Sequence, residues 1–282
     1  MKILILGGSG MLGHQLYRTL HDRIETYVTF RRINSSLPDY FDRSHLLEGV
    51  DAADFDSVIQ AVGKVHPDVV INCIGVVKQQ NTAKDPIICL SINSLFPHRL
   101  ARLCQAAQAR LIHVSTDCVF SGKKGNYTEA DYPDAEDLYG RSKLLGEIQG
   151  TGRLTLRTSI IGRELGTRQG LVEWFLSNQG QKVKGYRKAI FSGLTTDALA
   201  ELVGRVILHH PQLEGLWHVA AEPINKFALI SLVREVFEAD IAIEPEDQFC
   251  CDRSLCDNRF RKATGWAPPE WPAMIRAMRY AA

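Results

Sequence analysis

The chain lacks a strong imbalance of charge and lacks any long hydrophobic run. Its 282 residues carry 33 Lys and Arg against 32 Asp and Glu, a formal net charge of +1. A charge this small does not indicate a nucleic-acid or membrane partner, so an anionic ligand would need a local basic site. No apolar run reaches the roughly 18 residues of a membrane-spanning helix. The run Ile3–Leu6 meets Gly7 and Gly8 too soon to be a signal sequence. We expect a cytoplasmic protein.

Disulfide and metal frameworks are also absent from the sequence pattern. The seven cysteines, at positions 73, 89, 104, 118, 250, 251 and 256, are odd in number. Such a set is typical of free thiols in a reducing compartment. Cys250, Cys251 and Cys256 cluster, but no second CxxC or nearby His pair completes a zinc ligand set. We therefore expect no metal site.

Short apolar runs do occur, and through the first 160 residues they alternate with helical stretches. Runs of four to eight residues rich in Val and Ile are typical of strands buried on both faces. Strands are predicted at Ile3–Leu6, Thr26–Phe30, Asp68–Cys73, Arg110–Ser115 and Leu154–Ser159, and helices at Leu12–Leu20, Phe55–Val65 and Ser94–Ala107. This alternation predicts an α/β fold, a doubly wound parallel Rossmann sheet with a smaller C-terminal lobe.

The alternation weakens after about residue 160. Later helices are predicted at Leu171–Ser177, Thr195–His209, Phe227–Glu238 and Trp271–Tyr280, and one more strand at Leu216–Ala220. We predict that residues 1–161 with about 191–220 form the sheet domain. Residues from about 162 to 190, with 221–282, would form the smaller lobe.

A glycine-rich turn follows the first predicted strand directly. Ile3–Leu6 runs into Gly7-Gly8-Ser9-Gly10-Met11-Leu12-Gly13, where a helix begins. This order of strand, turn and helix is the setting of a dinucleotide-binding loop. Glycines let the backbone approach a pyrophosphate, and the helix N-terminus offers free N–H groups. The candidate coenzyme contacts here are Gly7, Gly10, Met11, Leu12 and Gly13.

The second predicted strand does not end in the acidic residue that NAD-binding proteins usually place there for the ribose 2′-hydroxyl. Phe30 is followed instead by Arg31 and Arg32. Two guanidinium groups can hold a 2′-phosphate through forked, charge-assisted hydrogen bonds. We expect NADP, as NADPH, to be the coenzyme of the sheet domain. NAD is the alternative if both arginines are only solvated.

Three further side chains form a candidate catalytic set. The strand predicted at Arg110–Ser115 leads into Thr116, while Tyr139 and Lys143 are four residues apart and so share one face of a helix. An ammonium beside a phenol favours the phenolate, so we expect Lys143 to lower the pKa of Tyr139. Tyr139 would protonate a carbonyl oxygen that Thr116 also hydrogen-bonds. A Tyr and a Lys at this spacing are common by chance, but their combination with the glycine turn is more specific.

These segments together resemble one known family. Ser115–Gly122, Tyr127–Asp131 and Tyr139–Glu147 are similar to the dTDP-4-dehydrorhamnose reductase branch of the extended short-chain dehydrogenases. The likeness covers nearly the whole chain and is clearest from residue 1 to about 165. It implies that Thr116, Tyr139 and Lys143 are catalytic.

The resemblance also implies contacts for both ligands. Cys118 replaces an aromatic residue that is common at its position, which leaves the sugar contact open. The C-terminal lobe offers basic residues for a sugar diphosphate, and no counterpart of the family's metal-linked dimer contacts is evident, although a homodimer remains open. The implied coenzyme contacts are Asp51, Ala52, Cys73, Ile74, Gly75, Tyr139 and Lys143, and the substrate contacts are Thr116, Asp117, Cys118 and Arg187.

The function implied by the resemblance is NADPH-dependent reduction of the 4-keto group of a nucleotide-linked 6-deoxyhexose, in the synthesis of precursors of surface polysaccharides. One alternative is a reductase of a UDP-linked 2-acetamido-2,6-dideoxy-4-ketohexose. Another is a 4-epimerase or 4,6-dehydratase, although a dehydratase would need an acidic pair where Asp117-Cys118 supplies one acid. The last is a non-catalytic NADP-binding regulatory subunit, as one relative is for methionine adenosyltransferase. The intact Thr, Tyr and Lys set disfavours it.

Overall fold

A seven-stranded parallel sheet forms the centre of the molecule. The computed structural model describes residues 1–33, 37–78, 81–166 and 168–280. The strand order is β11-β6-β5-β4-β1-β2-β3, so the order reverses between β1 and β4, as in a doubly wound fold. The strands are β1 (Lys2–Leu6), β2 (Glu25–Phe30), β3 (Leu46–Glu48), β4 (Val69–Asn72), β5 (Arg110–Thr116), β6 (Arg153–Thr158) and β11 (Gly215–His218). The predicted fold class is confirmed.

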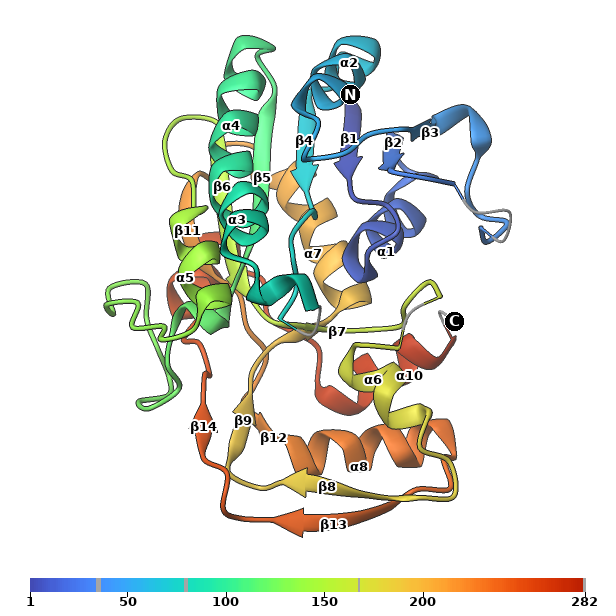
Figure 1. The fold of residues 1–282 in the computed structure, drawn as a ribbon, viewed down its shortest axis with the longest axis vertical. Helices are drawn as coiled ribbons and strands as arrows, with labels where there is room; N and C mark the ends of the chain where they lie inside the picture. The colour runs from blue at the N-terminus through green and yellow to red at the C-terminus, as the bar shows by residue number, and fades with distance from the viewer. Residues whose placement is uncertain (34–36, 79–80, 167, 281–282) are drawn as a thin grey trace.

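Helices cover both faces of this sheet (Figure 1). Successive side chains of a strand point to opposite faces. Ile3 and Ile5 of β1 therefore join the core under α1 (Met11–Leu20) and α7 (Thr196–His209). Leu4 and Leu6 join the second core, under α2 (Phe55–Val65) and α4 (Phe96–Ala106). Two buried faces explain why the strands read as continuous apolar runs.

The connection from β4 to α4 is irregular. It contains the 3-10 turn η2 (Asn81–Lys84), the short helix α3 (Pro86–Cys89) and the π-helical segment η3 (Leu90–Leu95). The helix predicted from Ser94 therefore becomes regular only at Phe96. Two more 3-10 turns, η1 (Arg43–His45) and η4 (Asp117–Val119), precede β3 and follow β5. Helix α5 (Leu138–Leu145) lies against η3.

The smaller lobe lies below the sheet in Figure 1. Its helices are α6 (Leu171–Leu176), α8 (Lys226–Phe237) and α10 (Trp271–Tyr280), while α9 (Asn258–Thr264) packs against β11 of the main sheet. Its strands pair as β7 (Ile160–Ile161) with β10 (Leu194–Thr195), β8 (Lys182–Tyr186) with β13 (Ala242–Glu246), and β9 (Ala189–Phe191) between β12 (Ile224–Asn225) and β14 (Cys251–Asp252). One apolar core runs from β1 through α7 into α8 and α10. The division into two domains therefore stays a prediction.

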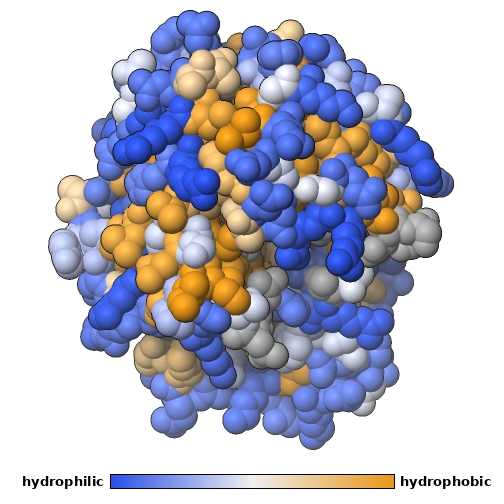
Figure 2. Space-filling model, turned by 45° about the horizontal axis from the view of Figure 1, so that its top comes forward, coloured by the Kyte–Doolittle hydropathy of each residue, from blue (hydrophilic) through white to orange (hydrophobic). Residues whose placement is uncertain are grey.

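The surface is mostly hydrophilic, with apolar patches between the polar side chains (Figure 2). Ile87 of α3, Leu95 of η3 and Leu145 of α5 are 76%, 56% and 59% exposed, on elements that contact one another. Exposed apolar residues grouped in this way are typical of protein interfaces. The homodimer left open by the sequence, for which no interface was predicted, is not tested by this patch. No helix in the described part of the chain is long and apolar enough to cross a membrane.

Candidate active site

The glycine turn after β1 leaves bare backbone at the start of α1. Gly7 has a φ of +93°, in the left-handed region that favours glycine. A Cβ on Gly13 would lie 2.1 Å from the Gly7 carbonyl oxygen, so only glycine allows α1 to pack this closely. The turn is fixed to β2, because the Gly7 N–H donates to Thr29 Oγ1 at 3.1 Å.

The N-terminus of α1 fits an anionic group. Gly10 is its N-cap, no side chain caps the helix, and no acidic residue lies in its first turn. Free N–H groups and the helix dipole therefore favour a phosphate here. Leu12 is buried in the core, so it can contact a coenzyme only through its backbone, while Met11 is half-buried.

The segment after β4 connects the glycine turn to Lys143. A Cβ on Gly7 would lie 3.1 Å from Ile74 Cγ1, and a Cβ on Gly75 would lie 3.9 Å from Lys143 Nζ. Cys73 directly precedes Ile74 and Gly75 in the chain. The structure thus brings Cys73, Ile74 and Gly75 between the two predicted parts of the coenzyme site, at the carboxyl edge of the sheet where α/β folds bind ligands.

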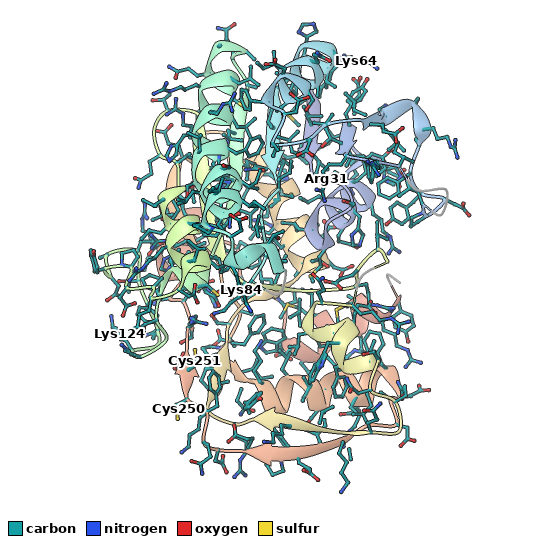
Figure 3. The ribbon with its side chains drawn as sticks, viewed as in Figure 1. Arg31, Lys64, Lys84, Lys124, Cys250 and Cys251 are labelled. Carbon is teal, nitrogen blue, oxygen red and sulfur yellow. The ribbon has the colours of Figure 1, made fainter. Side chains whose placement is uncertain are left out.

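Arg31 and Arg32 are exposed directly after β2, and Figure 3 shows Arg31 at the carboxyl end of that strand. An acidic residue that the sequence pattern did not predict lies near this segment. Glu48 of β3 accepts a hydrogen bond from Ile33 N at 2.9 Å. This carboxylate reaches the segment across the sheet, because β3 pairs with β2 and Glu48 is the register partner of Phe30.

Asp51 and Ala52 lie at the same edge of the sheet. The Val50 N–H donates to the Phe30 carbonyl oxygen at 3.0 Å, which joins the turn after β3 to the end of β2. Asp51 Oδ1 accepts from Ala53 N at 2.9 Å, and Ala52 is buried. Both predicted adenine-side residues therefore lie next to Val50, which is hydrogen-bonded to the end of β2.

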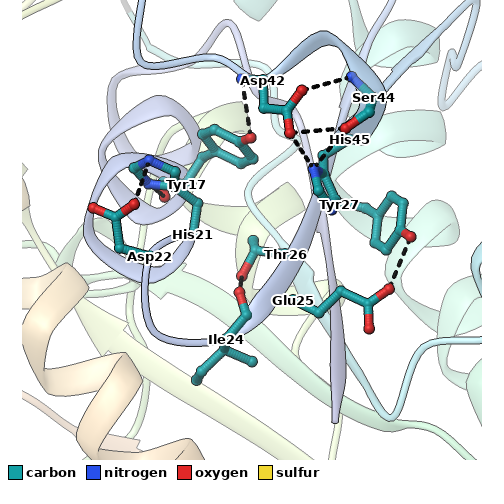
Figure 4. A network of polar contacts seen from close by, with 10 residues as sticks. All are labelled: Tyr17, His21, Asp22, Ile24, Glu25, Thr26, Tyr27, Asp42, Ser44 and His45. Carbon is teal, nitrogen blue, oxygen red and sulfur yellow. Dashed lines mark hydrogen bonds and ion pairs between the residues drawn. The ribbon is translucent and has the colours of Figure 1, made fainter.

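A hydrogen-bond network holds residues 42–45, just before β3, against α1 (Figure 4). The Asp42 N–H donates to Tyr17 Oη at 3.2 Å. Asp42 Oδ1 accepts from Ser44 N, and Oδ2 lies 2.9 Å from His45 Nδ1. Hydrogen bonds from Ser44 and His45 keep the pKa of Asp42 below its usual value. Residues 42–45 are thus fixed to the surface of α1.

Thr116, Tyr139 and Lys143 come together at the end of β5. Gly140 lets α5 approach closely, since a Cβ there would lie 2.2 Å from the Cys118 carbonyl oxygen. The Thr116 hydroxyl lies near the Tyr139 phenol and lowers the pKa of that phenol. Lys143 Nζ donates to the Val114 carbonyl oxygen at 2.8 Å. The structure brings the three predicted catalytic side chains together, while their roles stay predictions.

The expected lowering of the Tyr139 pKa by Lys143 is wrong for this structure. Burial raises the pKa of Tyr139 well above its ordinary value of 10, and nearby Cys118 and Asp117 raise it further. Burial also lowers the pKa of Lys143 to about 8. Lys143 is directed to the Val114 carbonyl, and the loss of hydration outweighs its field at the phenol. The phenol is therefore protonated at neutral pH, which is the form that a proton donor needs.

The predicted sugar-side residues form a tight turn after β5. Thr116 Oγ1 donates to Asp117 Oδ1 at 3.2 Å and accepts from Cys118 N at 3.1 Å. Burial raises the pKa of Asp117, and positive charges on Arg253 and Lys226 oppose that rise. Burial also raises the pKa of the Cys118 thiol to about 12. Cys118 is therefore a neutral thiol beside Thr116 and Asp117.

Arg187, the fourth predicted substrate contact, does not lie in the turn after β5. It is exposed on the loop after β8 and forms an ion pair with Asp247, with Nε 2.8 Å from Oδ1. Within the described ranges, no contact joins Arg187 to Asp117 or Tyr139. Its role at the substrate stays a prediction that this geometry does not favour.

Sequence reasoning missed Asn93, Lys226 and Arg253. Asn93 Oδ1 accepts from Val76 N at 2.9 Å and its Nδ2 donates to Ser142 Oγ at 3.1 Å, so it ties the segment after β4 to α5. Its position in the π-helical segment η3 would have been a signal, because such segments often occur at functional sites, but the sequence does not reveal one. Lys226 and Arg253 come from the C-terminal lobe and belong to no local motif.

No group of three or more His, Cys, Asp or Glu side chains in the described residues could hold a metal ion. The seven cysteines are free.

Known proteins resemble the chain in sequence and in structure. The RmlD substrate binding domain family matches residues 1–251. The probable low-salt glycan biosynthesis reductase Agl14 of Haloferax volcanii is 32% identical over 148 residues, 52% of this chain and 48% of that protein. The dTDP-4-dehydrorhamnose reductase of Streptomyces griseus is 34% identical over 145 residues, 51% of this chain and 43% of that protein. The alignments therefore span less than half the length of these curated relatives.

Two crystal structures share the fold along nearly the whole chain. A hypothetical dTDP-4-dehydrorhamnose reductase from Sulfolobus tokodaii has a TM-score of 0.79 and 28% identity, covering 96% of this chain and 98% of that chain. A dTDP-4-dehydrorhamnose reductase from Bacillus anthracis in complex with NADP has a TM-score of 0.82 and 21% identity, covering 100% and 99%. The chain belongs to the RmlD substrate binding domain family, and it has the fold of dTDP-4-dehydrorhamnose reductase-like extended short-chain dehydrogenases.

Proposed function

We propose that this chain uses NADPH to reduce the 4-keto group of a nucleotide-linked 6-deoxyhexose, a step toward the deoxysugar precursors of surface polysaccharides. The observation that supports this most is the meeting of Thr116 and Tyr139 at the end of β5, with Lys143 beside Gly75. A proton donor and a hydrogen-bond donor thus face the edge of the sheet where the glycine turn exposes its backbone.

The fit of this site to the coenzyme rests on features of the chain itself. Bare backbone at Gly7 and Gly13, with the uncapped N-terminus of α1, suits a pyrophosphate. When bound, NADPH supplies the hydride. The chain's residues then orient the two reactants and stabilise the charge that develops on oxygen.

Tyr139 and Thr116 act on the oxygen of the keto group. As that oxygen gains negative charge, the protonated Tyr139 gives it a proton and the Thr116 hydroxyl hydrogen-bonds it. The Lys143 ammonium lies on the same helix and adds positive charge near the developing anion.

We propose that Arg31 and Arg32 select NADPH over NADH. Replacing both by alanine should raise the dissociation constant for NADPH on the order of 10- to 100-fold, because one charge-assisted contact contributes about 1.5–3 kcal/mol. The constant for NADH should change by less than about twofold, since NADH has no 2′-phosphate. Fluorescence titration with both coenzymes measures this.

The matched control is Arg276→Ala, which removes an exposed arginine of α10. It should change neither constant. An R31A/R32A protein that still binds NADPH as tightly as the parent would contradict the assignment of these arginines.

The substrate is tested with a panel of 4-keto sugars linked to dTDP or UDP. We expect NADPH oxidation with at least one dTDP-linked 6-deoxy-4-ketohexose, followed by absorbance and by product mass. Turnover only of a UDP-linked 2-acetamido-2,6-dideoxy-4-ketohexose would favour the alternative reductase, and isomerisation without NADPH consumption would favour an epimerase. Binding of NADPH with no turnover of any member would favour a regulatory subunit.

A further inference from the structure

Two cations of the C-terminal lobe lie beside the catalytic residues. Strands β12 and β14 flank β9. Lys226 directly follows β12 and Arg253 directly follows β14. The Asp252 N–H donates to the Gly122 carbonyl oxygen at 2.8 Å, and Arg253 Nε donates to the Phe120 carbonyl oxygen at 2.8 Å. The small sheet therefore carries both cations to the segment that follows Thr116 and Asp117.

Neither cation has the partners that such groups usually have. Within the described residues, Lys226 has no hydrogen bond and no acid within ion-pair distance, and its Nζ lies 4.2 Å from the centroid of the Phe191 ring. Arg253 uses only Nε in a hydrogen bond, so both of its terminal NH₂ groups lack an acceptor among the described residues. Both residues are half-buried, and a charged donor that loses part of its hydration without gaining an acceptor costs free energy. This arrangement is therefore typical of a site that awaits an anion.

The local charge is also unbalanced. Asp117 supplies the negative charge that acts on both Lys226 and Arg253, which together carry two positive charges. Lys78, the next nearby cation, is already paired with Asp137, with Nζ 2.6 Å from Oδ2. Burial lowers the pKa of Lys226, and a bound anion would offset that cost. An excess positive charge thus remains beside Asp117.

Three other basic residues of the lobe already form ion pairs with acids. Arg187 pairs with Asp247, Arg163 pairs with Glu173, and Lys182 pairs with Glu244. A sugar diphosphate would have to break these ion pairs to bind there. Lys226 and Arg253 offer free donors without that cost.

We infer that Lys226 and Arg253 form the subsite for the diphosphate that links the sugar to its nucleoside. The inference rests on the proposed function, which places the keto group at Thr116 and Tyr139. The anomeric carbon, which carries the diphosphate, lies across the pyranose ring from C4. The diphosphate is therefore one ring away from Tyr139, on the side of Asp117 where the two cations lie.

The test is direct binding of nucleoside diphosphates by calorimetry. Lys226→Met and Arg253→Met should each weaken binding of dTDP or UDP by about tenfold or more, and leave binding of NADPH unchanged. Thymidine and uridine, which lack phosphate, should bind the variants and the parent equally. In turnover assays KM should rise by a similar factor while kcat changes by less than about threefold, because the reacting groups are intact.

Matched controls separate a specific contact from a general change of charge. Lys64→Met and Arg102→Met remove exposed cations of α2 and α4, and Figure 3 shows Lys64 at the far end of the molecule from Cys251 of β14. They should bind nucleoside diphosphates like the parent. Lys226→Arg and Arg253→Lys keep the charge and should recover most of the binding, which a loss of folding would not allow.

The outcomes distinguish this inference from the proposed function. If K226M and R253M bind dTDP and UDP as the parent does, or if Arg187→Met causes the loss instead, the subsite is overturned even when keto-sugar reduction is observed. If both variants lose diphosphate binding while no keto sugar is reduced, the subsite stands and the reductase activity fails. Equal binding of inorganic pyrophosphate by variants and parent would also count against the subsite.

Discussion

Replacing Tyr139 by phenylalanine should lower NADPH-dependent turnover by about 10²–10⁴-fold, the range expected for loss of a general acid. The ring remains, so the packing of α5 against Cys118 is kept, and only the hydroxyl that meets Thr116 is lost. The dissociation constant for NADPH should change by less than about twofold. Steady-state kinetics and a coenzyme titration on the same preparation measure both quantities.

The matched control for this change is Tyr132→Phe, because Tyr132 is 85% exposed. It should have the turnover of the parent. If Tyr139→Phe keeps more than about a tenth of the parent turnover, the proton donor is another group and the proposed role of Tyr139 is wrong.

Lys143→Met should abolish most turnover and at the same time make the protein more stable. Burial lowers the pKa of Lys143 from 10.5 to about 8, and a shift of that size corresponds to about 3 kcal/mol of disfavoured charge. Methionine has a similar length and no charge. The free energy of unfolding should therefore rise by up to about 3 kcal/mol at neutral pH, as expected where function conflicts with stability.

The gain in the free energy of unfolding from Lys143→Met should depend on pH. Below about pH 8, Lys143 is charged in both the folded and the unfolded chain, so the folded parent bears the full cost of burying the charge. Between about pH 8 and 10.5 the folded chain binds fewer protons than the unfolded one, and the cost disappears. The advantage of Lys143→Met should thus be largest below pH 8 and should vanish toward pH 10.5.

Denaturant unfolding at several pH values measures this advantage. Lys262→Met, which removes an exposed lysine of α9, is the control and should show no such dependence. A Lys143→Met protein that is less stable than the parent at pH 7 would show that the ammonium is well solvated or well paired, contrary to its burial.

Much of the fold could be predicted from sequence because its strands are buried on both faces. A short apolar run such as Ile3–Leu6, followed by glycines, has few possible structures other than a buried strand. The amphipathic helix predicted at Phe55–Val65 has the same bounds as α2. β3 was missed because Leu46–Glu48 is an edge strand of three residues, too short to show the alternation of apolar and polar residues that indicates a strand. The π-helical segment η3 was missed because its local apolar pattern reads as an ordinary helix.

The candidate site was predictable where one local segment carries the chemistry. The glycine turn and the Tyr139–Lys143 spacing are of this kind, and the structure brings both to one edge of the sheet. Glu48, Lys226 and Arg253 reach the site only through pairing of distant strands, which no local pattern records. The Tyr139 pKa was predicted wrongly because burial depends on the whole fold rather than on the spacing of two residues.

Transfer of deuterium from [4-²H]NADPH to the sugar tests the central claim most directly. With a dTDP-linked 6-deoxy-4-ketohexose, and with coenzyme labelled separately on each face, one of the two should give a product that is one mass unit heavier. NMR should place that deuterium at C4 of the sugar. Oxidation of NADPH without label at C4, or no oxidation with any keto-sugar nucleotide, would contradict the account.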